Sequence, residues 1–157
     1  WGSPPVVLVV VRSQQELGMD AAASEASTAV PGNWLGPKHP EKARRDALAF
    51  GNWAALTPPG TNVWLNPPYY PPQLLRGFLE RAVATAGEGV PVIALVPAST
   101  GTTWWHDLVV DVGASVEFLR GRLTFGGPHS TGGPAPWSSA LVLYEVSSVL
   151  PNVSAGE

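Results

Sequence analysis

Residues 62–69 read Asn-Val-Trp-Leu-Asn-Pro-Pro-Tyr, and this stretch decides the predicted fold. The apolar character of residues 62–65 predicts a strand, and the polar, proline-rich and aromatic residues 66–69 end it. In open α/β folds, ligands bind at the carboxyl ends of parallel strands. The stretch therefore predicts both a strand and a candidate site directly after it.

The residues that follow predict a helix and a second strand. Apolar residues recur at helical spacing, and Gly87 and Gly89 end the helix. The spaced residues are Leu74, Leu75, Phe78, Leu79, Ala82 and Val83. The apolar run Val92–Val96 lies between two prolines and predicts a buried parallel strand. Strand, helix and strand in this order indicate an α/β fold with right-handed crossovers.

Further elements are predicted towards the carboxyl end of the chain. A second helix is expected over Thr103–Val112, a strand and turn over Val116–Phe125, and a last strand over Ala140–Val146. We expect one domain over residues 1–146 and a frayed tail over residues 147–157.

The amino-terminal third of the chain leaves two interpretations open. The β-branched run Val6–Val11 is typical of a buried strand, but the prolines before it also suit a helix with proline in its first turn. Residues 25–43 are expected to form loops, and residues 41–50 to hold a short helical turn.

The composition excludes several classes of protein. Of 157 residues, 45% are apolar, which excludes a disordered polar chain. The absence of cysteine excludes disulfides, thiolate zinc sites, iron–sulfur clusters and a cysteine nucleophile. The longest aliphatic run, Val6–Val11, is far short of the roughly 20 residues of a membrane span, so we expect no membrane association.

The net charge and the start of the chain also limit the function. A net charge of −3 excludes a basic protein that coats nucleic acid, although local basic patches remain. The chain starts at Trp1 without a signal-peptide pattern. We interpret it as part of a cytoplasmic protein that continues upstream.

The residue types at 66–69 suit the methylation of an exocyclic amine on a base. Such an amine is a poor nucleophile, because its lone pair is delocalised into the ring. Acceptors on both amine hydrogens counteract this delocalisation, and the Asn66 side-chain oxygen and the Pro67 carbonyl are candidates. Pro68 stiffens the loop, and Tyr69 offers a flat face for an extruded base. The alternative is one more turn in a chain that has three other proline pairs.

The chain resembles the phage-type DNA adenine-N6 methyltransferases, small Rossmann-like enzymes that use S-adenosylmethionine. The resemblance runs from Trp1 to about Glu145 and extends beyond Asn-Pro-Pro-Tyr. Its other segments are Leu95–Ala98 with Trp104-Trp105-His106-Asp107, Phe118–Gly127 around Arg120-Gly121-Arg122, and residues 135–142. It implies a mostly parallel sheet with helices on both faces, and double-stranded DNA as substrate. It also implies a bacterial, phage or prophage origin.

The same resemblance implies where the cofactor binds. Residues 1–4 resemble a Thr-Pro element that lies against the methionine part of the cofactor, and Ser3 keeps the hydroxyl. Residues 17–24 resemble the first cofactor-binding strand and its loop, and residues 46–48 resemble a later acidic element. The implied contacts are Ser3, Pro4, Asp20, Ala21, Ala23, Asp46, Leu48 and Asn66. Taken without the resemblance, residues 20–24 favour a helix capped by Asp20, and Asp46 a solvated charge.

Candidate DNA contacts come from two regions. Arg120 and Arg122 flank Gly121 and, in strand geometry, point the same way, towards phosphate or the target strand. Trp104 and His106 are candidates for contact with bases. A second basic cluster, made of Lys38, Lys42, Arg44 and Arg45, is either a phosphate contact or solvated surface.

Two alternatives to DNA adenine methylation remain open. The first is methylation of another amine, namely cytosine N4, RNA adenine or protein glutamine. The second is a non-catalytic member that binds cofactor or DNA. It is motivated by Ser99, Gly101 and Thr103, where the family often has arginine, an acidic residue and lysine. The three histidines show no metal-binding spacing, so no metal site is expected.

Overall fold

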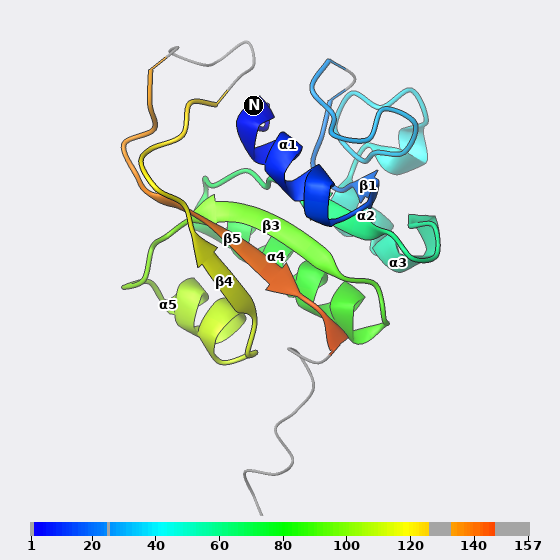
Figure 1. Cartoon of the computed structure of the whole chain (residues 1–157). Coiled ribbons are helices and arrows are strands. Elements are labelled where there is room, and N and C mark those ends of the chain that lie inside the picture. Colours follow the sequence, from blue (N-terminus) through cyan, green and yellow to red (C-terminus); the bar gives the residue numbers. More distant parts are fainter. Residues whose placement is uncertain (1, 25, 126–132, 147–157) are drawn as a thin grey trace, which may run out of the picture.

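The fold centres on one five-stranded sheet with the strand order β1-β2-β3-β5-β4. The computed structural model describes residues 2–24, 26–125 and 133–146 (Figure 1). The strands are β1 (Leu17–Asp20), β2 (Asn62–Leu65), β3 (Val92–Pro97), β4 (Ser115–Phe118) and β5 (Ser139–Tyr144). The strands predicted around residues 62, 92 and 140 are confirmed.

The sheet is mixed, but most of its strands share one direction. Parallel ladders join β1 to β2 and β2 to β3. Strand β5 runs antiparallel to both of its neighbours, β3 and β4. Strands β1 to β4 therefore point one way and β5 points the other way. The predicted α/β class is confirmed, and the sheet is mixed, with two parallel and two antiparallel ladders among the described strands.

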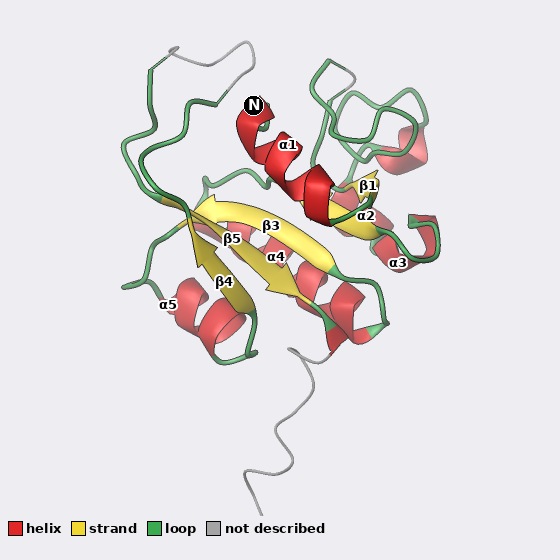
Figure 2. Cartoon of the chain, viewed as in Figure 1, coloured by secondary structure: helices red, strands yellow, loops and turns green. Residues whose placement is uncertain are grey.

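Helices cover both faces of this sheet (Figure 2). Helix α1 (Pro5–Gln14) lies on one face, and α4 (Pro72–Gly87) lies on the other with three short helices. The short helices are α2 (Ala47–Phe50), α3 (Trp53–Leu56) and α5 (Thr103–Trp105), the last continued by a π-helical turn, η2 (His106–Val110). A 3-10 turn, η1 (Lys42–Arg44), precedes α2.

Alternation along β3 divides the core between the two faces. Val92, Ala94 and Val96 pack in the cluster that contains the α4 side chains. Ile93 and Leu95 pack in the cluster that contains Val7 and Val11 of α1. Both faces of β3 are therefore apolar and covered by other parts of the chain, as predicted for a buried strand.

The run Val6–Val11 forms a helix and not a strand. Pro4 is the N-cap and Pro5 occupies the first helical position, where its fixed φ favours a helix. Val7 and Val11 are both 5% exposed and lie four residues apart, so they form the buried stripe of α1. Packing against the sheet thus overrides the β propensity of valine.

Other local predictions differ from the structure in identifiable ways. Residues 21–24 form a loop, so the alternative of a helix capped by Asp20 is wrong. The helix expected over Thr103–Val112 consists of α5 and η2. The tail over residues 147–157 lies outside the described residues. No helix in the described part of the chain is long and apolar enough to cross a membrane.

Gly36 allows the loop after β1 to pack closely. A Cβ atom at Gly36 would overlap the backbone carbonyl of Ala23. Backbone hydrogen bonds from Leu35 N to Asp20 O and from Ala23 N to Leu35 O hold the same contact, at 2.8 and 2.9 Å. Residues 33–36 therefore support the loop that follows the carboxyl end of β1.

We expect Gly36→Ala to lower the free energy of unfolding by about 1–3 kcal/mol, because the backbone must move to admit the methyl group. Gly32→Ala is the matched control in the same loop, since a Cβ atom there meets nothing within 4 Å. Urea unfolding followed by tryptophan fluorescence measures both variants. Equal stability of the two variants would contradict the close approach at Gly36.

Candidate active site

The carboxyl ends of β1, β2 and β3 meet at one edge of the sheet. Asp20 is the last residue of β1, and Asn66 directly follows β2. The register pairs Asp20 with Trp64, and Leu65 with Ala94, so these ends lie side by side. Asp20 and Asn66 are only 2% and 3% exposed. Two polar side chains are therefore buried at the edge where the sequence predicts a site.

Both ends of the Asn66 amide have partners. Asn66 Nδ2 donates to Ser3 Oγ at 3.2 Å, and Asn66 Oδ1 accepts from the Tyr69 hydroxyl at 3.3 Å. The indole Nε1 of Trp64 also donates to Ser3 Oγ, at 2.9 Å. These contacts join the start of the chain to the loop after β2.

The Tyr69 hydroxyl makes a shorter hydrogen bond elsewhere. It donates to the Leu95 carbonyl at 2.9 Å, whereas its oxygen lies 3.3 Å from Asn66 Oδ1. A phenol has one hydrogen and a carboxamide oxygen has two lone pairs. Asn66 Oδ1 therefore retains capacity to accept a further hydrogen bond. Burial raises the pKa of Tyr69, so this hydroxyl stays protonated.

The Pro67 carbonyl is a second acceptor beside Asn66. Pro67 is buried and lies outside β2. No hydrogen bond to its carbonyl oxygen comes from the part of the chain that the structure describes. The loop thus offers an amide oxygen and a backbone oxygen on consecutive residues, which fits a donor with two hydrogens.

Two aromatic side chains complete the surroundings of Tyr69. The Tyr69 ring packs edge-on against Phe125 and Trp137, with ring centroids 6.0 and 5.5 Å away. We call Tyr69, Phe125 and Trp137 the aromatic cluster. Phe125 and Trp137 were not among the candidate residues, although both lie in segments that carry the family resemblance. Their separation from Tyr69 along the chain hides this contact from sequence reasoning.

Asp20 shapes the loop that follows it. Its carboxylate accepts hydrogen bonds from Ala22 N at 3.2 Å, Thr28 Oγ1 at 3.4 Å and Ala29 N at 2.7 Å. Ala21 is fully buried and Ala23 is 9% exposed. Small side chains after β1 allow a ligand to approach the backbone closely, so this loop fits a cofactor site.

Asp46 is the N-cap of α2 and Leu48 lies within α2, on the α4 face of the sheet. The Asp46 carboxylate caps this helix, accepting from Leu48 N and Ala49 N at 3.1 Å each. Leu48 packs against Gly77 of α4. Asp46 is exposed, so its carboxylate also faces solvent.

The candidate DNA contacts fall into two groups. Arg120, Arg122 and His106 are exposed, whereas Trp104 is 8% exposed and packs in the core. This burial favours a structural role for Trp104. Strand β4 ends at Phe118, and Gly121 turns the chain with φ of 72°. The expectation that Arg120 and Arg122 lie in a strand is therefore wrong.

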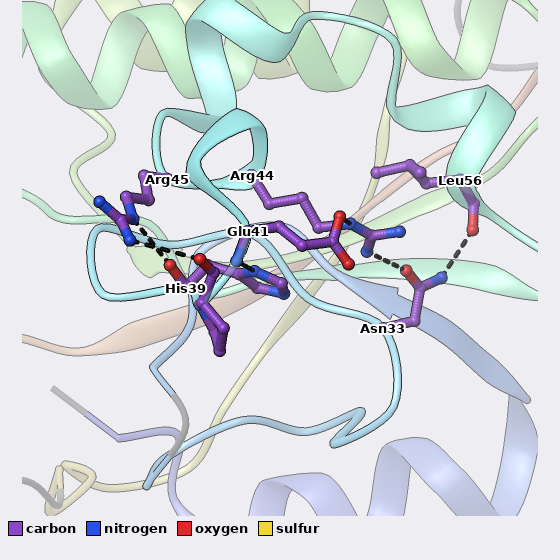
Figure 3. A network of polar contacts seen from close by, with 7 residues as sticks. Asn33, His39, Glu41, Arg44, Arg45 and Leu56 are labelled. Carbon is purple, nitrogen blue, oxygen red and sulfur yellow. Dashed lines mark hydrogen bonds and ion pairs between the residues drawn. The ribbon is translucent and has the colours of Figure 1, made fainter.

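The second basic cluster is partly used to hold its own loop together (Figure 3). Arg44 Nη1 donates to Asn33 Oδ1 at 2.9 Å, and Arg45 Nε donates to the His39 carbonyl at 2.8 Å. Asn33 in turn donates to the carbonyls of Gly18 and Leu56. These contacts favour a structural role for both arginines over phosphate binding, whereas Lys38 and Lys42 are exposed.

The histidines are placed apart. His39 packs on Trp34, with ring centroids 4.4 Å apart, and His106 Nε2 donates to the Thr100 carbonyl at 2.8 Å. His129 lies outside the described residues. Among the described side chains, no group of three or more histidines and carboxylates could hold a metal ion.

Comparison with known proteins identifies related sequences and folds. A family model described as DNA N-6-adenine-methyltransferase (Dam) matches residues 1–141. No curated protein matches the chain. The precorrin-6Y C5,15-methyltransferase from Geobacter metallireducens is similar in structure, with 12% identity and a TM-score of 0.45. The match covers 89% of this chain and 86% of that one.

The buried Tyr69 hydroxyl predicts a loss of stability at alkaline pH. Because burial raises the pKa of Tyr69, the folded protein keeps this proton where an unfolded tyrosine, with a pKa of about 10, loses it. This contribution to stability is constant below about pH 10 and is lost as the pH rises further.

Urea unfolding over this range measures the effect. Tyr69→Phe should show a smaller alkaline fall in the free energy of unfolding than the wild type. Tyr70→Phe, which alters a residue that is 84% exposed, is the matched control and should keep the wild-type fall. Identical pH profiles for Tyr69→Phe and the wild type would refute the assignment.

Proposed function

The chain belongs to the DNA N-6-adenine-methyltransferase (Dam) family, and we propose that it methylates the N6 amine of adenine in double-stranded DNA. The observation that carries this proposal is the pair of acceptors on Asn66 and Pro67. Asn66 Oδ1 shares the single Tyr69 hydrogen with Leu95, and among the described residues the Pro67 carbonyl accepts none. An amine with two hydrogens matches this pair.

The two acceptors would activate the target amine. Hydrogen bonds from N6 to Asn66 Oδ1 and to the Pro67 carbonyl favour a pyramidal nitrogen and localise its lone pair. S-adenosylmethionine would supply the methyl group, with its carbon–sulfur bond breaking as the nitrogen–carbon bond forms. The nitrogen would lose its proton to water afterwards, so no strong general base is needed. The chain contributes chiefly by positioning the amine and excluding water from it.

The aromatic cluster would receive the base. An adenine must leave the helix before its amine can reach Asn66. Tyr69 supplies a flat apolar surface beside Asn66, and the Leu95 carbonyl fixes its ring by accepting from the hydroxyl. Phe125 and Trp137 hold the ring in place through T-shaped contacts. A base stacked there would bring its amine towards the two acceptors.

S-adenosylmethionine is the cofactor implied by the family, and it would supply an electrophilic methyl group. The loop of Asp20, Ala21 and Ala23 would hold it at the carboxyl end of β1, with Ser3 and Pro4 on the methionine part. Ser3 Oγ accepts two hydrogen bonds and keeps its own hydrogen. That hydrogen suits the carboxylate of an amino acid. Asp46 and Leu48 are the proposed contacts of the adenine part.

We expect Asn66→Ala to lower kcat for DNA methylation by at least about 100-fold, because one of the two acceptors is removed. Cofactor affinity should change little, since the Asn66 oxygen faces the target amine. Glu88→Ala, an exposed change at the C-cap of α4, is the control. Nucleoside mass spectrometry for N6-methyladenine measures activity, and calorimetry measures binding. An active Asn66→Ala variant would remove Asn66 from this role.

Arg120 and Arg122 are the proposed phosphate contacts. Replacing both with glutamine should reduce the slope of log K against log salt concentration by about 0.9 for each lost contact. Lys38→Gln, in the other basic cluster, should leave the slope unchanged. Fluorescence anisotropy with duplex DNA over a salt series measures the slopes. A larger change for Lys38→Gln than for the arginine pair would move the interface to residues 38–45.

Two alternatives are distinguished by direct measurement. The acceptor pair also suits cytosine N4, RNA adenine or protein glutamine, so product analysis should include DNA, RNA and protein. Ser99, Gly101 and Thr103, which lie after β3 at the same edge, lack the charges common in the family and motivate a non-catalytic alternative. Calorimetric titration with S-adenosylmethionine tests it, because absence of binding would exclude the enzyme.

A further inference from the structure

Ser3 lies between two side chains from the same stretch of chain. Its hydroxyl oxygen accepts from Trp64 Nε1 at 2.9 Å and from Asn66 Nδ2 at 3.2 Å. Trp64 and Asn66 are 0% and 3% exposed, and Ser3 is half-buried. A residue near the start of the chain therefore contacts the amide that faces the proposed site.

The Trp64 contact limits what Ser3 can do. An indole nitrogen can only donate a hydrogen bond, so Ser3 Oγ must present a lone pair to it. Trp64 is held in the sheet by β2, and its buried N–H group requires an acceptor. Ser3 is thus fixed in place by a rigid neighbour, and its second lone pair is available to the Asn66 amide.

The orientation of the Asn66 amide has a chemical consequence. With Nδ2 on Ser3, Oδ1 points to the side of Tyr69, where an acceptor is needed for the target amine. With the amide rotated by half a turn, Nδ2 would face that amine. Two N–H donors would then oppose each other, and the amine would lose one of its two acceptors.

We propose that Ser3 is a positioning residue that orients the Asn66 amide so that Oδ1 faces the reacting amine. The inference rests on the proposed function of Asn66 as an amine acceptor. It differs from the cofactor contact implied for Ser3 by the family, because it uses the hydroxyl oxygen and not its hydrogen. The same hydroxyl can serve both purposes, since the two lone pairs and the hydrogen are separate.

The orientation can be measured without any activity. In nuclear Overhauser spectra of the wild-type protein, the Asn66 carboxamide hydrogens should lie near the Ser3 Hβ atoms and the Trp64 indole hydrogen. Stronger contacts from these hydrogens to the Tyr69 ring than to Ser3 would show the opposite orientation and overturn the inference. This measurement needs no variant, so it holds even if a Ser3 variant fails to fold.

Kinetics then test the consequence. At saturating S-adenosylmethionine, Ser3→Ala should lower kcat by about 10- to 100-fold through misplacement of the acceptor, with a much smaller change in the KM for DNA. Calorimetry measures cofactor affinity separately, because the same change removes the hydrogen that is proposed to bind the cofactor. Ser3→Thr keeps the hydroxyl and should restore kcat. Thr61→Ala, at a half-buried hydroxyl residue before β2 and so at the opposite end of that strand, is the control and should match the wild type.

The outcomes separate the two proposals. If Ser3→Ala keeps the wild-type kcat at saturating S-adenosylmethionine, or if a higher cofactor concentration restores its activity, Ser3 does not position Asn66. If the wild-type protein binds S-adenosylmethionine but methylates no nucleic acid, the proposed function fails. The nuclear Overhauser contacts of Asn66 still decide the orientation in that case.

Discussion

Parallel pairing of β1, β2 and β3 is the constraint on which the rest of the structure depends. It places Asp20, Asn66 and the loop after β3 at one edge of the sheet. Asp20 and Asn66 are buried there, so each must find hydrogen-bond partners. Asp20 obtains them from the loop that follows it, and Asn66 obtains them from Ser3 and Tyr69. The sheet edge thereby organises both loops of the candidate site.

The chain has few charged residues, and two of the arginines make hydrogen bonds that hold a loop together. Charged residues make up 13% of the sequence. Arg44 and Arg45 donate to backbone and amide oxygens of the segment between β1 and α2. In its described part, this segment holds only the 3-10 turn η1. Arg120 and Arg122, the phosphate contacts proposed above, are exposed. An acidic net charge is compatible with the proposed function, because a few local cations can contact phosphate.

The aromatic cluster shows how distant segments form one site. Tyr69 follows β2, whereas Phe125 and Trp137 both lie between β4 and β5. The Leu95 carbonyl of β3 fixes the Tyr69 hydroxyl, so the ring is held by the central strand. The position of the cluster beside Asn66 therefore depends on β2, β3 and β5 together.

The sequence by itself determined the elements whose signals are local. Short apolar runs predict β2 and β3, and helical spacing predicts α4. Asn66 is predicted as a site residue because it directly follows a strand. Only the tertiary structure decided that Val6–Val11 is a helix, because packing of Val7 and Val11 on the sheet outweighs valine's propensity for strands. The same holds for the partners of Asn66 and Tyr69. Contacts with Ser3, Phe125 and Trp137 join residues that are far apart in the chain, and a local sequence pattern does not predict such contacts.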